Sequence, residues 1–125
     1  MILIQNIMEV VFVYGTLRQG YHNHRLIMDC KILDIGRTVN NYAMYANGIP
    51  YVSETEAVSQ IYGELYLVSP KILLTLDMLE GHPSWYKRKK VPIETLNGKI
   101  YNAWLYFNET KTDNLIASGD YTDKG

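Results

Sequence analysis

One glutamate, Glu80, stands where its carboxylate can act as a base. The spacing Ile72, Leu76 and Glu80 continues an apolar helical stripe at i, i+4 and i+8, which turns the carboxylate inward at the last turn of a predicted helix. Burial and the negative end of the helix dipole both disfavour its charged form and raise its pKa, which suits a general base. The alternative is a side chain that extends to solvent. Asp77, one turn earlier, could bond local backbone or orient a partner.

A turn with two glycines, Tyr14–Gly20, offers a second chemical group. Gly15 and Gly20 allow backbone N–H groups to approach a ligand oxygen closely, as in a site for an anion or an oxyanion. The segment is not a phosphate-binding P-loop, because Tyr21 follows Gly20 where that motif requires lysine. An ordinary glycine turn is the alternative that these residues leave open.

Other catalytic chemistries find little support. No two of His22, His24 and His82 have the i, i+4 spacing of a helical metal site, and Cys30 adds only one thiol. The sequence contains no Gly-x-Ser-x-Gly segment, which a serine hydrolase of that type would need. We therefore expect no metal and no other cofactor.

Length and charge restrict the kind of protein and of partner. A chain of 125 residues is near the usual size of one domain and no linker or repeat divides it, so residues 1–125 are predicted to form a single domain. The 12 Lys and Arg residues against 13 Asp and Glu give no broad positive field for nucleic acid or an anionic membrane. The basic run Lys87–Lys90 fits a solvated strand edge better than a nucleic-acid patch. A small molecule is the expected partner.

The lone cysteine and the first residues of the chain bear on the compartment in which the protein is expected. Cys30 cannot form an internal disulfide, which favours a reducing compartment. The apolar start, residues 1–7, lacks the basic segment and cleavage site of a secretory signal and is too short to cross a bilayer. We interpret it as a strand extension or a loose leader, with Met8 as an alternative start, and expect a cytoplasmic protein.

The elements that position these residues are mostly strands. Segments rich in β-branched residues and tyrosine predict strands at 10–14, 32–39, 42–45, 58–68, 91–96 and 99–107. Asn97 and Gly98 form the turn of a hairpin between the last two. The residues after Asn108 are expected to form a polar tail.

Two short helices are predicted. The first extends from Asn23, as its cap, to about Met28. The second has Ser69 as cap and Pro70 in its first turn, and it ends at Gly81. Its inward stripe consists of Ile72, Leu73, Leu76 and Leu79. Many strands with two helices that do not alternate with them indicate an α+β protein, in which an antiparallel or mixed sheet curls into a small β-barrel.

Two motifs resemble those of the gamma-glutamylcyclotransferase-like family. The segment Val11–Gly20, with Asn23 and His24 after it, is similar to the opening of these proteins. The segment Leu76–Pro83 is similar to the one that carries the family's catalytic glutamate.

Further segments extend this resemblance over most of the chain. Tyr86 and Arg88 agree after the second motif, as do a strand at residues 63–66 and a segment at residues 118–121. Agreement of several motifs in order is improbable by chance, so the two alternatives left open above lose most of their weight.

The resemblance implies a barrel of about six strands, with the turn and Glu80 facing one cavity. It also implies cyclisation of a γ-glutamyl compound to 5-oxoproline, with Glu80 removing a proton from the substrate's α-amino group and with no cofactor. The site residues it implies are Glu80 as the catalytic residue and, for substrate binding, Tyr14, Gly15, Thr16, Leu17, Arg18, Asn23, Tyr86 and Tyr121.

The resemblance is nearer to the gamma-glutamylamine branch of the family, because the motif begins Tyr14-Gly-Thr-Leu rather than Tyr-Gly-Ser-Leu. This branch implies amides of the γ-glutamyl-lysine type as substrates. The alternative is a noncatalytic binder of small carboxylated ligands that uses the same cavity, against which the intact Glu80 argues. The sequence gives no indication of an oligomeric state.

Overall fold

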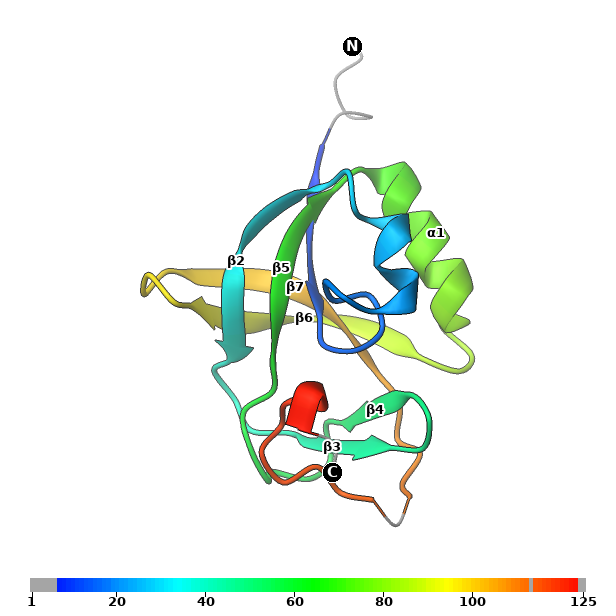
Figure 1. The fold of residues 1–125 in the computed structure, drawn as a ribbon, viewed down its shortest axis with the longest axis vertical. Helices are drawn as coiled ribbons and strands as arrows, with labels where there is room; N and C mark the ends of the chain where they lie inside the picture. Colours follow the sequence, from blue (N-terminus) through cyan, green and yellow to red (C-terminus); the bar gives the residue numbers. More distant parts are fainter. Residues whose placement is uncertain (1–6, 113, 124–125) are drawn as a thin grey trace.

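The computed structural model describes residues 7–112 and 114–123, which form a closed barrel with strand order β1-β5-β2-β6-β7 (Figure 1). Consecutive strands in this order are antiparallel, and a parallel bridge between Val11 of β1 and Trp104 of β7 closes the barrel. The barrel strands are β1 (Glu9–Val13), β2 (Lys31–Thr38), β5 (Tyr62–Val68), β6 (Lys87–Thr95) and β7 (Ile100–Phe107). The predicted α+β class with a small mixed barrel is confirmed.

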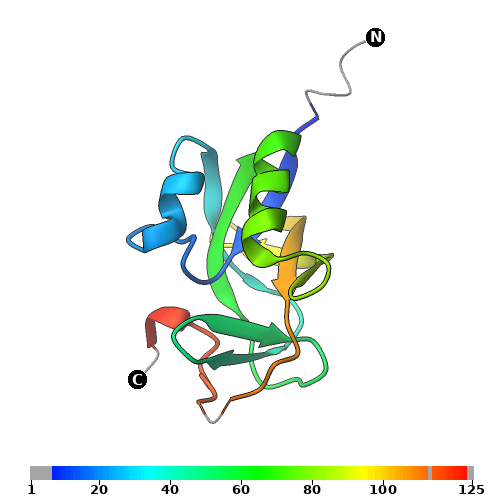
Figure 2. The ribbon, with the colours of Figure 1, turned by 90° about the vertical axis from the view of Figure 1, so that its right-hand side faces the viewer.

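Smaller elements surround the barrel. Strands β3 (Ala43–Ala46) and β4 (Pro50–Ser53) pair in a separate two-stranded sheet at one end of it. Helix α1 (Pro70–Glu80) lies along one side, next to the 3₁₀ helix His22–Leu26 (Figures 1 and 2). A second 3₁₀ helix, Tyr121–Asp123, lies beside the two-stranded sheet.

Helix α1 begins and ends where its sequence predicts. The Ser69 hydroxyl accepts the N–H of Ile72 at 3.1 Å, and Gly81 ends the helix in the left-handed conformation with φ of 66°. Leu73 and Leu76 are buried, but Leu79 is 40% exposed, so the inward stripe is shorter than predicted. The buried apolar stripe therefore ends before the last residues of the helix, among which Glu80 lies.

The predicted helix from Asn23 to Met28 is wrong. The segment forms only the 3₁₀ helix His22–Leu26, and no side chain caps it. The Asn23 amide instead donates to Thr16 Oγ1 at 2.9 Å. The cause is tertiary: the backbone N–H of Asn23 donates to the carbonyl of Thr16, which holds the segment against the preceding turn.

Several strand and tail predictions also need correction. Strand β4 was missed because it begins at a proline, a residue that usually argues against a strand. Strand β5 starts at Tyr62 rather than at residue 58, and β6 starts at Lys87 rather than at residue 91. The hairpin between β6 and β7 is confirmed. The N-terminal segment interpreted as a leader or strand extension lies, at residues 1–6, outside the described residues.

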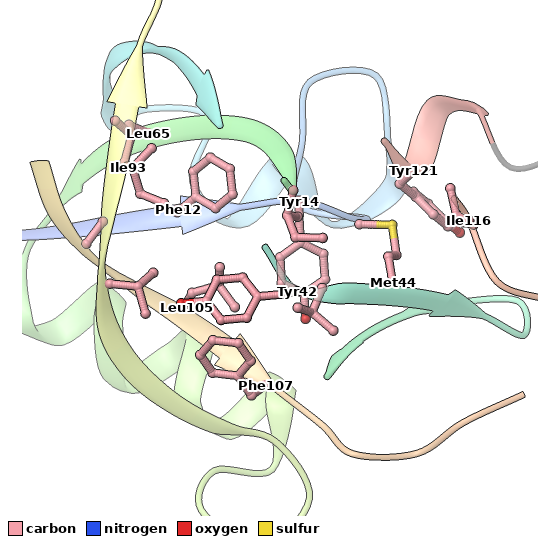
Figure 3. Close-up of a cluster of buried hydrophobic side chains, with 14 of the residues drawn as sticks. Phe12, Tyr14, Tyr42, Met44, Leu65, Ile93, Leu105, Phe107, Ile116 and Tyr121 are labelled. Atoms are coloured by element: carbon pink, nitrogen blue, oxygen red, sulfur yellow. The ribbon is translucent and has the colours of Figure 1, made fainter. Parts of the chain in front are cut away.

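The C-terminal segment is not a polar tail. Ile116 and Tyr121 are 4% and 3% exposed and belong to the hydrophobic core, where Figure 3 shows them beside Met44 of β3. The N–H of Ile116 donates to the carbonyl of Met44 at 2.8 Å, which ties the segment to β3. This short segment has no periodic apolar pattern in the sequence, although both side chains pack in the core.

Strand β1 is buried on both faces, which explains its unbroken apolar sequence. Phe12 packs in the barrel interior, whereas Val11 and Val13 face a second core beneath α1. Strand β1 and helix α1 run in the same direction along this side (Figure 1). Their C-terminal ends, with the turn after Tyr14 and with Glu80, consequently lie at the same end of the barrel.

Candidate active site

A cavity of about 170 Å³ lies where the ends of β1 and α1 meet. Its wall brings together six of the expected substrate-binding residues and the expected base: Tyr14, Gly15, Thr16, Leu17, Asn23, Tyr86 and Glu80. The other lining residues are Phe12, Val13, Ile49, Pro50, Leu79, Trp85 and Tyr106. Sequence motifs that are far apart in the chain therefore share one cavity.

Glu80 lies among three tyrosine rings. Burial is the main cause of the raised pKa values of Tyr14, Tyr86 and Tyr106, and the nearby charge of Glu80 adds to the rise in all three. Burial also raises the pKa of Glu80 itself to about 7. No hydrogen bond or ion pair joins its carboxylate to another described residue. A carboxylate in this state can accept a proton near neutral pH.

The three phenols around Glu80 donate their protons elsewhere. The Tyr14 hydroxyl donates to the Tyr106 carbonyl at 2.6 Å, and the Tyr86 hydroxyl donates to the Pro50 carbonyl at 2.8 Å. The Tyr106 hydroxyl donates to Asp77 Oδ1 at 2.7 Å. Because a phenol has one proton to donate, none of the three is available to Glu80 in this arrangement.

The turn after β1 presents unpaired donors to the cavity. No hydrogen bond joins the N–H groups of Gly15, Thr16 or Leu17 to another described residue. Asn23 holds the turn in place through its backbone N–H to the Thr16 carbonyl at 3.0 Å and through its side chain to Thr16 Oγ1. A Cβ on Gly15 would lie 2.4 Å from Pro50 Cγ, so this position needs glycine. Such a turn is suited to a carboxylate or an oxyanion.

Arg18 and Tyr121, both expected to bind substrate, do not line this cavity. Arg18 Nη1 donates to Asp120 Oδ1 at 2.9 Å, and its Nε lies 3.5 Å from Glu64 Oε2. Tyr121 is buried in the core, and its hydroxyl donates to the Gly48 carbonyl at 3.1 Å. Both residues stabilise the surroundings of the cavity, with Arg18 linking the turn to the C-terminal segment.

A buried ion pair stands behind the cavity wall. Asp77 accepts hydrogen bonds from Arg88 Nε at 2.8 Å and from Nη2 at 3.1 Å, and the Arg88 guanidinium lies 4.2 Å from the Trp104 ring centroid. Although burial acts in the opposite direction, the hydrogen bonds from Arg88 and Tyr106 lower the pKa of Asp77. Arg88 is therefore part of this pair and not of a solvated basic edge.

Sequence reasoning missed four residues that shape the site. Pro50 was overlooked together with strand β4, and Tyr106 was assigned to a strand without a role. Ile49 and Trp85 carried no local signal, because each reaches the cavity through a loop whose course depends on tertiary contacts. For Tyr106, the useful signal was its position two residues after Trp104 on the same strand face.

The described part of the chain has neither a cluster of metal ligands nor a membrane-spanning helix. Residues 7–112 and 114–123 contain no group of three or more His, Cys, Asp and Glu side chains placed to hold a metal ion. None of their helices has the length and apolar character that crossing a bilayer requires.

Comparison with known proteins agrees with the fold. Residues 11–123 match the model of the family described as gamma-glutamyl cyclotransferase, AIG2-like. A protein of Methanocaldococcus jannaschii, provisionally named a gamma-glutamylcyclotransferase, is 50% identical over 117 residues, which cover 93% of this chain and 98% of the relative. Gamma-glutamylaminecyclotransferase B of Danio rerio is 31% identical, over 91% of this chain and 71% of the relative.

A solved structure of a similar protein has the same fold. The crystal structure of an AIG2-like protein from Mus musculus superposes with a TM-score of 0.81 and 27% sequence identity, over 94% of this chain and 90% of the other. The chain thus belongs to the AIG2-like gamma-glutamyl cyclotransferase family. The family and the cyclotransferase type of enzyme that the sequence predicts are confirmed.

Proposed function

We propose that this protein cyclises a γ-glutamyl amine to 5-oxoproline and releases the amine, with Glu80 as the general base. One observation carries the proposal: a carboxylate with a pKa near 7 and a turn with three unpaired N–H groups line the same cavity. A γ-glutamyl compound has a nucleophile and an electrophile in one molecule, so it needs no serine nucleophile and no metal.

The reaction follows from these two groups. The α-amino nitrogen of the substrate is inert while protonated, and Glu80 would accept one of its protons. The nitrogen then attacks the γ-carbonyl carbon and a five-membered ring closes, and the bond to the leaving nitrogen breaks as that nitrogen takes the proton from Glu80. The ring nitrogen loses its second proton, through the regenerated Glu80 carboxylate, to the released amine, which becomes an ammonium ion. The N–H groups of Gly15, Thr16 and Leu17 would stabilise the oxyanion or hold the substrate's carboxylate. Atoms and charge balance without a co-reactant.

The cavity wall favours an amine as leaving group over an amino acid. Among the residues that the structure describes, those lining the cavity include no lysine, arginine or histidine, so an amino-acid leaving group would find no cationic partner there for its carboxylate. Ile49, Pro50, Leu79 and Trp85 also line the cavity and offer apolar surface to an alkyl or aryl group. The similarity to a gamma-glutamylaminecyclotransferase of Danio rerio supports the same choice.

The test is a substrate panel with 5-oxoproline as the measured product. Purified protein is incubated with γ-glutamyl amines, γ-glutamyl amino acids and glutathione, and the Glu80→Gln variant is run in parallel. We expect release of 5-oxoproline from the amines at the highest kcat/KM and none above background with the variant. A protein that binds small carboxylates but produces no 5-oxoproline from any of these compounds would be a noncatalytic binder, and the proposal would be wrong.

A further inference from the structure

The Tyr106 hydroxyl stands near two carboxylates and is bonded to only one of them. Asp77 and Glu80 occupy positions i and i+3 of helix α1, so their Cβ atoms are neighbours, roughly 5–6 Å apart, on one helix face. The hydroxyl donates to Asp77 Oδ1 at 2.7 Å, while the Tyr106 ring lines the cavity that contains Glu80. The charge of Glu80 also contributes to the raised pKa of Tyr106, so this phenol lies close to both carboxylates.

We infer that Asp77 is a positioning residue: it holds the Tyr106 hydroxyl away from Glu80 and so leaves the Glu80 carboxylate without a hydrogen-bond donor. The inference rests on the proposed function only for its kinetic consequence. The arrangement itself is a property of the folded chain and can be measured without turnover.

Asp77 is the stronger acceptor because it is held ionised. Arg88 of β6 donates two hydrogen bonds to it and is itself fixed against the Trp104 ring. The nearby His82 side chain also lowers the pKa of Asp77 electrostatically. A hydrogen bond to an ionised acceptor is shorter and stronger than one to a neutral acceptor. Glu80, which is buried without a cation, cannot compete for the phenol on equal terms.

The other two tyrosines beside Glu80 also donate to other acceptors. Tyr14, at the end of β1, donates to a backbone carbonyl, and Tyr86, beyond the C-terminal end of α1, donates to another. Asp77 is thus the one side-chain acceptor among the three that withhold phenol protons from Glu80. It is also the one that a substitution can remove.

The consequence is a stronger base. A hydrogen bond to a carboxylate favours its ionised form and lowers its affinity for a proton. With the donor withheld, Glu80 retains the proton affinity that burial gives it, and it can accept a proton from the substrate's ammonium group near neutral pH.

The experiment is a double-mutant cycle with Asp77→Ala and Tyr106→Phe in the full chain. The Glu80 carboxyl carbon is titrated by ¹³C NMR, and the pH profile of kcat/KM for 5-oxoproline release is recorded alongside. We expect Tyr106→Phe alone to leave the Glu80 midpoint unchanged, since this hydroxyl does not contact Glu80. We expect Asp77→Ala to lower the midpoint by about one pH unit, the size of a charge-assisted hydrogen bond. The double variant should return the midpoint toward that of the parent.

Two outcomes overturn the inference. One is a midpoint that Asp77→Ala leaves unchanged. The other is a shift of equal size with and without Tyr106→Phe, which would show a purely electrostatic or structural effect of Asp77. If Asp77→Ala does not fold because Arg88 loses its partner, the pair Asp77→Ala/Arg88→Leu, which leaves no unpaired buried charge, replaces it in the cycle.

The two proposals fail separately. An NMR cycle with the expected pattern in a protein that produces no 5-oxoproline would refute the function and retain the positioning role of Asp77. Active protein with an unchanged NMR midpoint in Asp77→Ala would refute the positioning role and retain the function.

Discussion

Replacement of Glu80 by glutamine should abolish turnover and stabilise the protein. The amide preserves the size of the side chain, but it cannot accept the ammonium proton. Loss of a general base reduces rates by roughly 10²- to 10⁴-fold, or about 3 to 5 kcal/mol of barrier. Substrate affinity should change little, since the N–H groups of the turn and the apolar wall are intact in the variant.

The gain in stability follows from the raised pKa of Glu80. Burial moves this pKa from the ordinary 4.5 to about 7. Between these values the folded state holds a proton that the unfolded state has lost, so stability falls as the pH rises through this window. At about 1.4 kcal/mol per unit, the full effect above pH 7 is about 3 kcal/mol. Because Glu80 is not fully buried, we expect about 1–3 kcal/mol.

The assay is thermal unfolding of the parent and of Glu80→Gln across this pH range. At about pH 4 the two should unfold at nearly the same temperature, because Glu80 is protonated in both states of the parent. At pH 8 the variant should unfold at a temperature higher by roughly 3–10 °C. Glu94→Gln is the matched control, since Glu94 forms an exposed pair with Arg37 outside the cavity. It should give no such pH-dependent gain.

Activity supplies the second half of the same test. Parent kcat/KM should rise about tenfold per pH unit below pH 7 and level off above it, because only ionised Glu80 is a base. A Glu80→Gln variant that retains near-full 5-oxoproline release would show that Glu80 is not the base. A stability difference between parent and variant that does not vary between pH 4 and pH 8 would show that the carboxylate is not desolvated.

Three further predictions concern the turn after β1, the core packing of the C-terminal segment and the binding of small carboxylates. Gly15→Ala should lower kcat/KM by roughly 10²-fold, because the added Cβ would displace Pro50 and the turn. Gly20→Ala is the control: its Cβ would meet open space, so kcat/KM should not fall, although the positive φ of Gly20 should lower stability. Tyr121→Ala should lower the free energy of unfolding in urea by about 3–5 kcal/mol, and a loss below about 1 kcal/mol would show that the C-terminal segment does not pack in the core. Small carboxylates, including 5-oxoproline, should inhibit competitively, and steady-state rates that are indifferent to them would argue against an anion-binding turn.

The sequence by itself determined those features whose causes are local. Helix α1 could be predicted because Ser69, Pro70 and Gly81 mark its ends through hydrogen bonds and backbone angles within a few residues. The hairpin at Asn97 and Gly98 has the same kind of local cause. The inward direction of Glu80 also follows from helical periodicity alone. The two family motifs brought the turn and Glu80 to attention for the same reason, since each is a short continuous segment.

Tertiary structure alone decided how these segments meet. Closure of the barrel places the end of β1 beside the end of α1, and strand β4, which begins at a proline, completes the wall with Pro50. Asn23 holds the turn instead of capping a helix because its partner, Thr16, lies within reach only in the folded loop. The basicity of Glu80 likewise depends on residues from four separate segments, because burial and the direction of each phenol are properties of the assembled cavity and not of any one segment.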